Sequence, residues 1–259
     1  MTTDRNFDDL AHRFRNRIYG GLKGDVRLAV LNRDLAPLLA EGAGNLKIVD
    51  AGGGQGQFAL DLAAGGHRVL LADISAQMLA QAAAQVEERQ LRERVTLLHR
   101  PLQELPEVPE LQGADLVICH AVLEWLAQPK QAIEQLRKLL KPGGYLSLTF
   151  YNRRALEFRL LQRGSFRQLD RNIETGHWGG HPGSLTPQNP LLQEWVQDWL
   201  AQAGLSVVAH SGIRCFHDFM TPAIREKLPA AAIVEKELEY SRIDPYRQLA
   251  RYIHLLCRL

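Results

Sequence analysis

The clearest chemical signal in the sequence is a glycine run, VDAGGGQGQ at residues 49–57, followed by an isolated acid, Asp73. The run fits the pattern D-x-G-x-G-x-G, which begins at Asp50 and ends at Gly56. Glycines after a strand let the backbone turn tightly and let a ligand approach the chain closely. An acid about 20 residues beyond the first glycine can accept hydrogen bonds from both ribose hydroxyls of a nucleoside. These residue types at this spacing favour a nucleotide-like ligand.

The residues that follow the glycines restrict which ligand it could be. A P-loop ends in Gly-Lys-Ser/Thr, whereas Gln57 and Phe58 follow Gly56 and no lysine is placed to meet phosphates. The dinucleotide fingerprint G-x-G-x-x-G fails at its third position, which is Gln57 when counted from Gly52. NAD and S-adenosylmethionine (SAM) share the ribose-binding acid, so Asp73 does not separate them. A tight strand–helix turn without a ligand is the simplest alternative.

The composition excludes several classes of protein. The chain has 259 residues, of which 46% are hydrophobic and 23% charged, and this balance is typical of a globular protein with one large domain. Its three cysteines are far apart and form no CxxC pair, which argues against a disulfide framework or a zinc site and favours a reducing, cytoplasmic setting. The start, MTTDRNFDDL, is polar and no apolar run is long enough to span a bilayer, so we expect no membrane partner.

Short apolar runs alternate with helical segments, and this pattern must position the chemical residues. Strands are expected at 46–50, 67–73, 94–100, the start of 114–126, and 145–152. Ser75 offers an N-cap for the helix that follows Asp73, so the acid is not needed for that cap. LSVVAHSGI and ARYIHLLCRL predict two further strands after a helix at 191–205. The alternation predicts an α/β fold of the Rossmann-like type, with a parallel, doubly wound sheet.

Two segments interrupt this alternation. Residues 1–44 have apolar side chains at helical spacing, broken at YGGLKG, and we expect an N-terminal helical lid there. Residues 153–189 are rich in Arg, Gly and His and are expected to form an inserted basic segment that binds the substrate. Residues 45–152 and 190–259 then form the main domain.

The inserted segment has a marked local charge. Between 151 and 171, six arginines stand against two acids, which gives +4 in a chain whose net charge is +2. The arginines are Arg153, Arg154, Arg159, Arg163, Arg167 and Arg171. Phe158 and Phe166 lie among them, so the segment could hold phosphates while aromatic rings stack on splayed RNA bases; a solvated basic face is the alternative. His177 and His181 are four apart in a glycine loop, where we expect no metal site and favour a substrate lid.

Several ordered motifs in the second half of the sheet resemble those of the class I SAM-dependent methyltransferases. They are DLVICHAVLEWL, LKPGGYLSLTF and LLQEWVQDWLAQAGLSVV. The resemblance covers residues 45–152 and 190–259. It implies SAM as the cofactor and a mostly parallel, seven-stranded sheet with helices on both faces, which finishes in an antiparallel hairpin.

A closer resemblance runs along nearly the whole chain and is looser between 153 and 190. The motifs RNFDDLAHRFRNRIYGGLKGDVR, VDAGGGQGQ, DISAQML, CHAVLEWL, LTFYN and DPYRQLARYIH are similar to those of the bacterial tRNA 5-carboxymethoxyuridine methyltransferases. This implies a cytoplasmic enzyme that binds the tRNA anticodon loop and converts the carboxylate of 5-carboxymethoxyuridine, at the wobble position, into the methyl ester. A methyltransferase for a small carboxylic acid or other metabolite is the first alternative. A non-catalytic RNA-binding module with a vestigial SAM fold is the second.

The resemblance also assigns roles toward SAM to residues at the ends of the first three strands. Gly52 and Gly53 are expected to let the amino-acid end of SAM lie against the backbone, because a side chain there would collide with it. Asp73 is expected to hold the ribose. Leu102 is expected to border the adenine; many relatives carry an acid near this position, and this chain does not.

Two further residues are assigned to the methionine part of SAM. His120 ends the fourth strand, where the family places residues against that part; a core histidine is the structural alternative. Arg27 stands in the KG-x-x-R pattern of the family and is expected to pair with the SAM carboxylate. Without the resemblance, an arginine on an amphipathic helix would be read as a solvated charge.

The chemistry of ester formation asks for few catalytic groups. A carboxylate is ionised at pH 7 and is itself the nucleophile, so no general base is expected. Catalysis is expected to consist of holding an oxygen in line with the SAM methyl group while water is excluded. We favour Tyr151 and Arg154 as positioning residues, because the end of the fifth strand borders the transfer cleft. Other candidates are Arg153, Lys23, Arg17, Tyr19 and Asn152.

Overall fold

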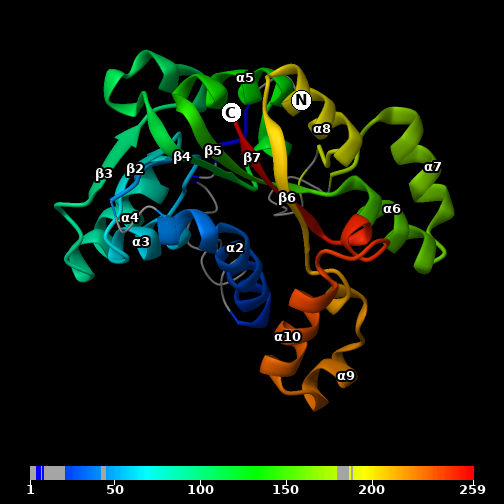
Figure 1. Ribbon diagram of the computed structural model, residues 1–259. Coiled ribbons are helices and arrows are strands. Elements are labelled where there is room, and N and C mark those ends of the chain that lie inside the picture. Colours follow the sequence, from blue (N-terminus) through cyan, green and yellow to red (C-terminus); the bar gives the residue numbers. More distant parts are fainter. Residues whose placement is uncertain (1–3, 7, 9–20, 42–44, 180–186, 188) are drawn as a thin grey trace.

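A seven-stranded sheet forms the centre of the protein, in the order β3-β2-β1-β4-β5-β7-β6 (Figure 1). The strands are β1 Lys47–Ala51, β2 Arg68–Asp73, β3 Val95–His99, β4 Ala114–His120, β5 Leu140–Tyr151, β6 Ser206–Ile213 and β7 Tyr252–Arg258. The pairs among β1 to β5 are parallel, whereas β7 is antiparallel to both β5 and β6. The predicted mostly parallel sheet with a closing antiparallel hairpin is therefore confirmed. The computed structural model describes residues 4–6, 8, 21–41, 45–179, 187 and 189–259.

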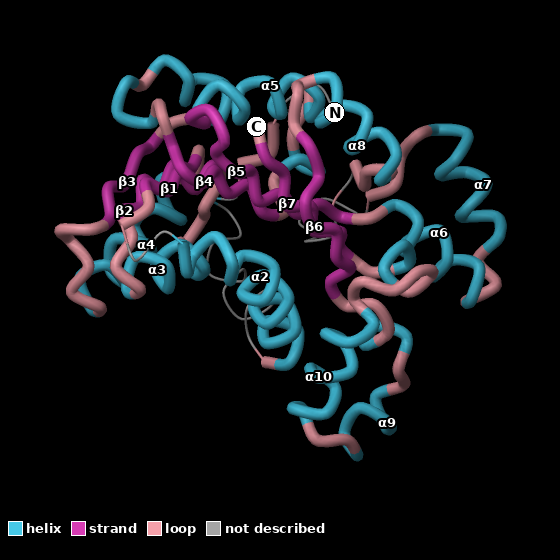
Figure 2. The backbone as a smooth tube through the Cα atoms, in the orientation of Figure 1, coloured by secondary structure: helices cyan, strands magenta, loops and turns pink. Residues whose placement is uncertain are grey.

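Helices cover both faces of this sheet, as predicted. They are α2 Leu22–Glu41, α3 Gln57–Ala64, α4 Ala76–Glu88, α5 Pro129–Leu139, α6 Arg153–Gln162, α7 Phe166–Thr175, α8 Gln193–Gln202, α9 Pro222–Lys227 and α10 Ala230–Tyr240. Figure 2 shows α2, α3 and α4 on one side of the sheet and α5 and α8 on the other, while α9 and α10 project from the main body. Within the described part of the chain, no helix combines the length and apolar character needed to cross a bilayer.

The two faces of the sheet carry separate hydrophobic clusters, because successive side chains of a strand point to opposite faces. In β1, Ile48 belongs to the cluster formed with α2 and α3, and its neighbour Val49 belongs to the cluster formed with α5 and α8. Val30 and Leu31 of α2 are fully buried in the first cluster. The helix that begins with the KG-x-x-R pattern is thus fixed against the sheet, and this places Arg27 at a defined position.

The fifth strand and the inserted segment differ in detail from the sequence expectation. The fifth strand ends at Tyr151, because the side chain of Asn152 accepts a hydrogen bond from the Arg154 amide (3.0 Å) and caps α6. Gly164, with a φ of 63°, separates α6 from α7, so the arginines of the inserted segment are divided between two helices. Between β6 and β7 the chain forms α9 and α10, which are separated near Leu228-Pro229.

Some expectations lie outside the described residues. Most of the first predicted helix falls there, including Arg17 and Tyr19. So does His181 of the glycine loop. The division of the chain into a lid, a main domain and an inserted segment stays a prediction.

Candidate active site

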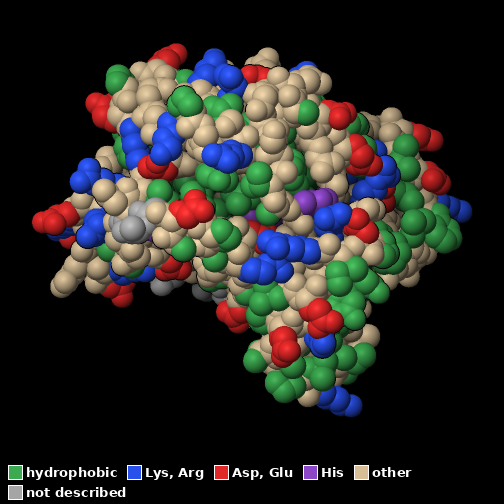
Figure 3. Space-filling view, in the orientation of Figure 1, with side chains coloured by type: hydrophobic (Ala, Val, Ile, Leu, Met, Phe, Trp, Pro, Cys, Tyr) green, Lys and Arg blue, Asp and Glu red, His purple; other side chains and the backbone are tan. Residues whose placement is uncertain are grey.

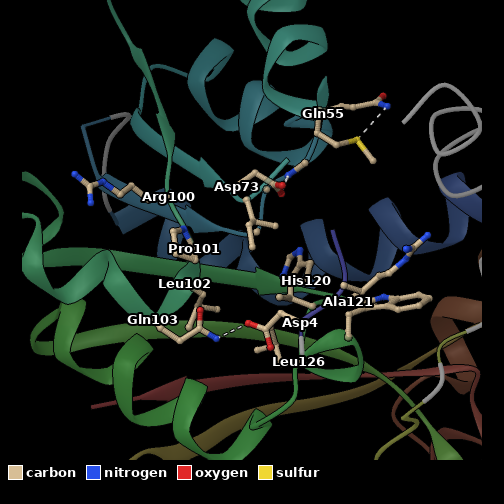
Figure 4. Close-up of a pocket in the computed structure, with 18 of the residues that line it drawn as sticks. Asp4, Gln55, Asp73, Arg100, Pro101, Leu102, Gln103, His120, Ala121 and Leu126 are labelled. Atoms are coloured by element: carbon tan, nitrogen blue, oxygen red, sulfur yellow. Dashed lines mark hydrogen bonds between the residues drawn. The ribbon is translucent and has the colours of Figure 1, made fainter. Parts of the chain in front are cut away.

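One pocket lies where the carboxyl ends of β1, β2 and β4 meet, on the edge at which ligands bind in open α/β sheets. All six residues that the sequence analysis assigned to the cofactor line it. They are Arg27, Gly52, Gly53, Asp73, Leu102 and His120. Figure 4 shows Asp73, Leu102 and His120 around this pocket, each on a different element. The fold thus brings together residues that are spread along the sequence, and their roles toward SAM stay predictions.

The glycine turn after β1 is packed against protein atoms more closely than the sequence suggested. An added Cβ at Gly52 would lie 2.6 Å from Val122 Cγ2, and one at Gly53 would lie 2.6 Å from Asp50 Oδ2. Gly52 also has a backbone φ of 77°, a value that residues other than glycine rarely adopt. A side chain here was expected to collide with the ligand; in the structure it would first collide with the protein. Gly56 allows close packing between β2 and α3, since its added Cβ would lie 2.6 Å from Leu71 and 3.2 Å from Leu60.

The carboxylate of Asp73 is held by two backbone amides. The Gly54 amide donates to Oδ2 and the Ser75 amide donates to Oδ1, both at 2.8 Å. Ser75 itself caps α4 by accepting from the Met78 amide at 3.1 Å, which confirms the predicted N-cap. Each Asp73 oxygen can accept a second hydrogen bond, so the orientation of the carboxylate suits a pair of ribose hydroxyls.

The two acids beside the glycine turn lie in an environment that disfavours their charge. Burial and the nearby Asp73 raise the pKa of Asp50 to about 7. Burial also raises the pKa of Asp73, although its two backbone hydrogen bonds oppose that shift. A ligand that carries positive charge, as SAM does at its sulfonium and ammonium groups, would favour the ionised form of both acids.

His120 is held from behind by a chain of buried polar side chains. His120 Nε2 lies 2.8 Å from Ser147 Oγ, and Ser147 Oγ lies 3.0 Å from His254 Nε2. His254 Nδ1 lies 2.8 Å from Asp34 Oδ2 on α2. Burial, together with the nearby His254 and Arg27, lowers the pKa of His120 well below its usual range, so its ring is neutral.

Ser147, His254 and Asp34 have the residue types of a hydrolase triad, but their position excludes that chemistry. Ser147 and His254 are completely buried, and Asp34 is 3% exposed. A nucleophilic serine must reach its substrate, and Ser147 sits between two histidines inside the sheet. The chain of contacts instead orients the ring of His120 toward the pocket.

The N-terminal residues that the structure describes lie across the mouth of the pocket. Asp4 accepts hydrogen bonds from the Gln103 side chain (2.7 Å) and from the Ala127 amide (2.8 Å). Asp8 accepts from Ser75 Oγ at 2.5 Å on the side of α4. Contacts at both rims suit the expected N-terminal lid.

The two favoured positioning residues occupy very different surroundings. Tyr151 is 1% exposed, and its hydroxyl has no hydrogen-bond partner among the described residues. Burial raises its pKa to about 12, so the hydroxyl stays protonated. Arg154 lies outside the pocket, where it donates to Glu157 (3.0 Å) and Glu194 (3.1 Å). These hydrogen bonds raise the pKa of Arg154 and direct its guanidinium group toward protein carboxylates.

Two of the remaining described candidates, Arg153 and Asn152, also serve local contacts. Arg153 pairs with Glu157 (3.1 Å) and lies 4.2 Å from the ring centre of Trp178. Asn152 is buried and donates to the backbone oxygens of Gln248 (2.8 Å) and Ala250 (2.9 Å).

A second, smaller pocket next to Tyr151 was missed by the sequence analysis. It is lined by Ala155, Arg159, Arg214, Asp218, Phe219 and Arg251, and we call it the cationic pocket. Arg214 pairs with Asp218 at 2.6 Å, and Arg251 Nε lies 3.7 Å from the same carboxylate. Burial would raise the pKa of Asp218, but the hydrogen bond with His217 and the charges of Arg214 and Arg251 hold it well below its usual range.

Tyr252 connects the cationic pocket to the larger one. The Arg27 guanidinium lies 4.5 Å from the centre of the Tyr252 ring, and the Arg214 guanidinium lies 5.6 Å from it. Tyr151 packs edge-on against the same ring at 5.4 Å, and Arg251 lies 4.8 Å from the Tyr151 ring. The sequence analysis named Tyr151 and Arg159 separately and noted Arg251 and Tyr252 within the DPYRQLARYIH motif, but it did not place them at a shared site.

Comparison with known proteins agrees with this geometry. Residues 49–146 match the family model described as "Methyltransferase domain". The chain is 38% identical over 256 residues to the tRNA 5-carboxymethoxyuridine methyltransferase of Escherichia coli, a match that covers 98% of this chain and 96% of that protein. It is 26% identical to the demethylmenaquinone methyltransferase of Clavibacter sepedonicus, over 77% of this chain and 81% of that protein.

The fold is also found among solved structures. The magnesium protoporphyrin IX methyltransferase of Synechocystis, solved with bound S-adenosylhomocysteine, superposes with a TM-score of 0.63. The match covers 97% of this chain and 95% of that protein at 20% sequence identity. At this identity the likeness concerns the fold alone, and it agrees with the Rossmann-like architecture described above.

Proposed function

Since the chain belongs to the family of the tRNA 5-carboxymethoxyuridine methyltransferases, we propose that it is a SAM-dependent enzyme that methylates the carboxylate of 5-carboxymethoxyuridine at the tRNA wobble position. The product is the methyl ester, 5-methoxycarbonylmethoxyuridine. The observation that carries the proposal is the end-to-end likeness to a relative with this activity, because it includes both the cofactor side and the acceptor side of the molecule. A tRNA substrate implies that the protein acts in the cytoplasm.

The larger pocket fits SAM at each point where its chemistry can be compared. The glycine turn presents backbone without side chains, and the carboxylate of Asp73 is oriented for a ribose. Arg27 is 3% exposed and brings a positive charge to the pocket, where it would pair with the SAM carboxylate. Neutral His120 would lie beside the amino-acid end. Leu102, which is 7% exposed, would offer apolar surface to the adenine.

Bound SAM supplies an electrophilic methyl group, and an ionised carboxylate accepts it without a proton transfer. The residues of this chain therefore need only bind both partners, align them and exclude water. Tyr151 suits this role, because its protonated hydroxyl can donate a hydrogen bond and is placed at the end of β5. Arg154 would have to leave Glu157 and Glu194 before it could contact an acceptor.

The α6–α7 segment would contact the anticodon loop. Arg163, Arg167 and Arg171 are all exposed there. Phe166 and Ile173 are 58% and 53% exposed, so apolar surface lies beside these cations. Figure 3 shows hydrophobic, basic and acidic side chains together over α7, whose exposed acids are Asp170 and Glu174. Cations with neighbouring aromatic surface suit phosphates and unstacked bases.

Analysis of tRNA nucleosides tests this proposal directly. A strain that lacks the gene is expected to accumulate unesterified 5-carboxymethoxyuridine, and the purified protein with SAM is expected to restore the ester on that tRNA. Unchanged nucleosides in the deletion strain, together with no transfer in vitro, would contradict the proposal and favour an enzyme that methylates a metabolite. Calorimetric binding of SAM separates both enzymes from an RNA-binding module that has lost its cofactor.

A further inference from the structure

The geometry points to the cationic pocket as an oxyanion-binding subsite on the acceptor side of the transfer site, which takes a carboxylate or a phosphate of the RNA substrate. This inference rests on the proposed function, because it names the residues that hold the acceptor in that reaction. The residues are Arg159, Arg214 and Arg251, and the charge of Lys23 interacts with those of the last two. They come from four different segments of the chain, so only the folded protein places them together.

The pocket contains more positive charge than its own carboxylate can balance. Arg159, Arg214 and Arg251 line it with Asp218 as the one acid among the lining residues. Arg159 forms no ion pair within the part of the chain that the structure describes. Asp218 pairs with Arg214 and Arg251, and its other oxygen lies 3.1 Å from His217 Nδ1. Lys23 is close enough for its charge to interact with those of Arg214 and Arg251.

The cations are also partly removed from water. The side chains of Arg214 and Arg251 are 12% and 16% exposed. The pKa of Arg159 is lowered by burial and then by the charge of Arg251. The pKa of Lys23 is lowered by burial and then by the charge of Arg214. Charges in such a place are stabilised by an opposite charge that enters with the ligand.

Several donors in and beside the pocket lack an acceptor. The Nε atoms of Arg214 and Arg251 are buried without a hydrogen-bond partner among the described residues, and so is the Tyr151 hydroxyl. A buried donor left without a partner costs free energy, and native structures contain few of them. An oxyanion is a strong acceptor with several lone pairs, so it could satisfy more than one of these groups at once.

The backbone at Arg214 supports the same interpretation. Arg214 has a φ of 63°, a left-handed conformation that is unfavourable for an arginine. Its amide oxygen accepts a hydrogen bond from the Arg251 amide at 3.2 Å, which ties the end of β6 to the start of β7. Residues held in such conformations cluster at functional sites.

The position of the pocket suits an acceptor subsite. Tyr252 packs against Arg27 of the larger pocket and against Arg214 of the cationic pocket, so one aromatic side chain separates the two. Methyl transfer requires that donor and acceptor lie next to each other and in line. A substrate anion held by Arg214 and Arg251 would place the modified uridine at the boundary between the two pockets.

Two forms of one tRNA test the inference and identify the anion. We would measure the dissociation constants of wild type, Arg159→Gln and Arg214→Gln for the tRNA with 5-carboxymethoxyuridine and for the same tRNA with unmodified uridine. Arg159→Gln is the safer variant for folding, because Arg159 has no ion pair within the described residues. Arg92→Gln is the matched control, since Arg92 is an exposed arginine beside Glu87 on the opposite side of the molecule. Calorimetric SAM affinity serves as the folding check.

If the pocket binds the carboxylate, each variant is expected to bind the modified tRNA about tenfold more weakly than wild type does. The affinity for the unmodified tRNA is then expected to change little. Equal weakening for both tRNAs would assign the pocket to a phosphate, and both results support an oxyanion subsite. Wild-type affinity of both variants for both tRNAs would overturn it. If wild-type protein methylates the modified tRNA and the variants do so equally well, only the pocket inference fails. If wild-type protein does not methylate it, the proposed function fails and the inference falls with it.

Discussion

His254 Nδ1 lies 2.8 Å from Asp34 Oδ2, and this contact joins the last strand of the sheet to the helix that carries Arg27. Asp34 also accepts from Arg33 (2.9 Å) and Arg242 (2.7 Å), so its carboxylate is a fixed acceptor. Burial would raise its pKa, but the hydrogen bond with His254, followed by that with Ser211 and the charge of Arg33, holds it below the usual range. His254 therefore carries a proton on Nδ1 and presents Nε2 to Ser147. Through Ser147, the orientation of the His120 ring depends on a carboxylate that does not touch the pocket.

Ser147→Ala is expected to loosen His120 and to weaken SAM binding. The substitution removes the one hydroxyl between the imidazole rings of His120 and His254, so one nitrogen of each ring loses its partner. The free energy of unfolding is expected to fall by about 1–3 kcal/mol, as for other buried groups left unpaired. Urea unfolding and calorimetric SAM titration measure the two effects. Ser165→Ala is the control, because Ser165 precedes α7 without a side-chain cap. If Ser147→Ala is destabilised but binds SAM with wild-type affinity, the contacts from Asp34 to His120 contribute to stability alone and do not support SAM binding.

Asp73→Asn tests the ribose contact. The asparagine has nearly the same shape, but its amide nitrogen would face the N–H of Gly54 or of Ser75, which now donate to the carboxylate. We expect SAM affinity to fall by about tenfold or more, because charge-assisted hydrogen bonds to the ribose are also lost. Calorimetry with Asp61→Asn, a substitution at a half-exposed carboxylate on α3, provides the comparison. Equal SAM affinity of the two variants would mean that Asp73 does not hold the ribose.

Asp50 is expected to make the ligand-free protein less stable as the pH rises. Burial and Asp73 raise its pKa from 3.8 to about 7, so between these values the folded state binds a proton that the unfolded state has lost. The stabilisation is complete below about pH 4 and is lost as the pH rises to about 7, at up to about 1.4 kcal/mol per unit. Glu124 contributes in the same direction, because burial raises its pKa to about 7. Burial lowers the pKa of His120 and His210, which opposes the trend below about pH 6.5.

The comparison of wild type with Asp50→Asn isolates the effect of this one acid. Asparagine has no titration, so the stability of wild type relative to the variant is expected to fall between pH 5 and pH 8. Urea unfolding at several pH values, without ligand, measures this difference. A difference that does not change with pH would show that Asp50 is already ionised in the folded protein at pH 5.

The sequence could predict the cofactor side of the site because its signals are local. The glycine run and Asp73 each stand directly after an apolar strand, and parallel strands bring such positions to one edge. The acceptor side depends on contacts between distant segments. Arg214 and Arg251 meet only because β6 and β7 pair, and no spacing in the sequence links them to Arg159. Arg154 looked available in the sequence, whereas Glu194, a residue of α8, pairs with it in the fold.

The α6–α7 segment is expected to give tRNA binding a steep dependence on salt. Arg167→Ala removes an exposed cation, so it is expected to weaken binding moderately and to reduce the slope of log affinity against log salt by about 1. Filter binding over a range of salt concentrations measures both quantities, and Arg92→Ala is the control for loss of an exposed arginine elsewhere. A slope that is the same in wild type, variant and control would exclude a phosphate contact at Arg167.

Tyr151→Phe separates a catalytic contact from a structural one. The Tyr151 hydroxyl is buried and has no partner among the described residues, so its removal is expected to leave stability unchanged or to raise it slightly. If the hydroxyl donates to the acceptor carboxylate, kcat/KM for the modified tRNA falls by about tenfold to a hundredfold while SAM affinity is retained. Arg154→Ala, assayed beside it, tests the other positioning candidate, and ester formation at the wild-type rate would remove Arg154 from the mechanism.

Because burial keeps the Tyr151 hydroxyl protonated up to about pH 12, its contribution is expected to stay constant from pH 6 to pH 9. A loss of rate in Tyr151→Phe that varies with pH over this range would point to another group.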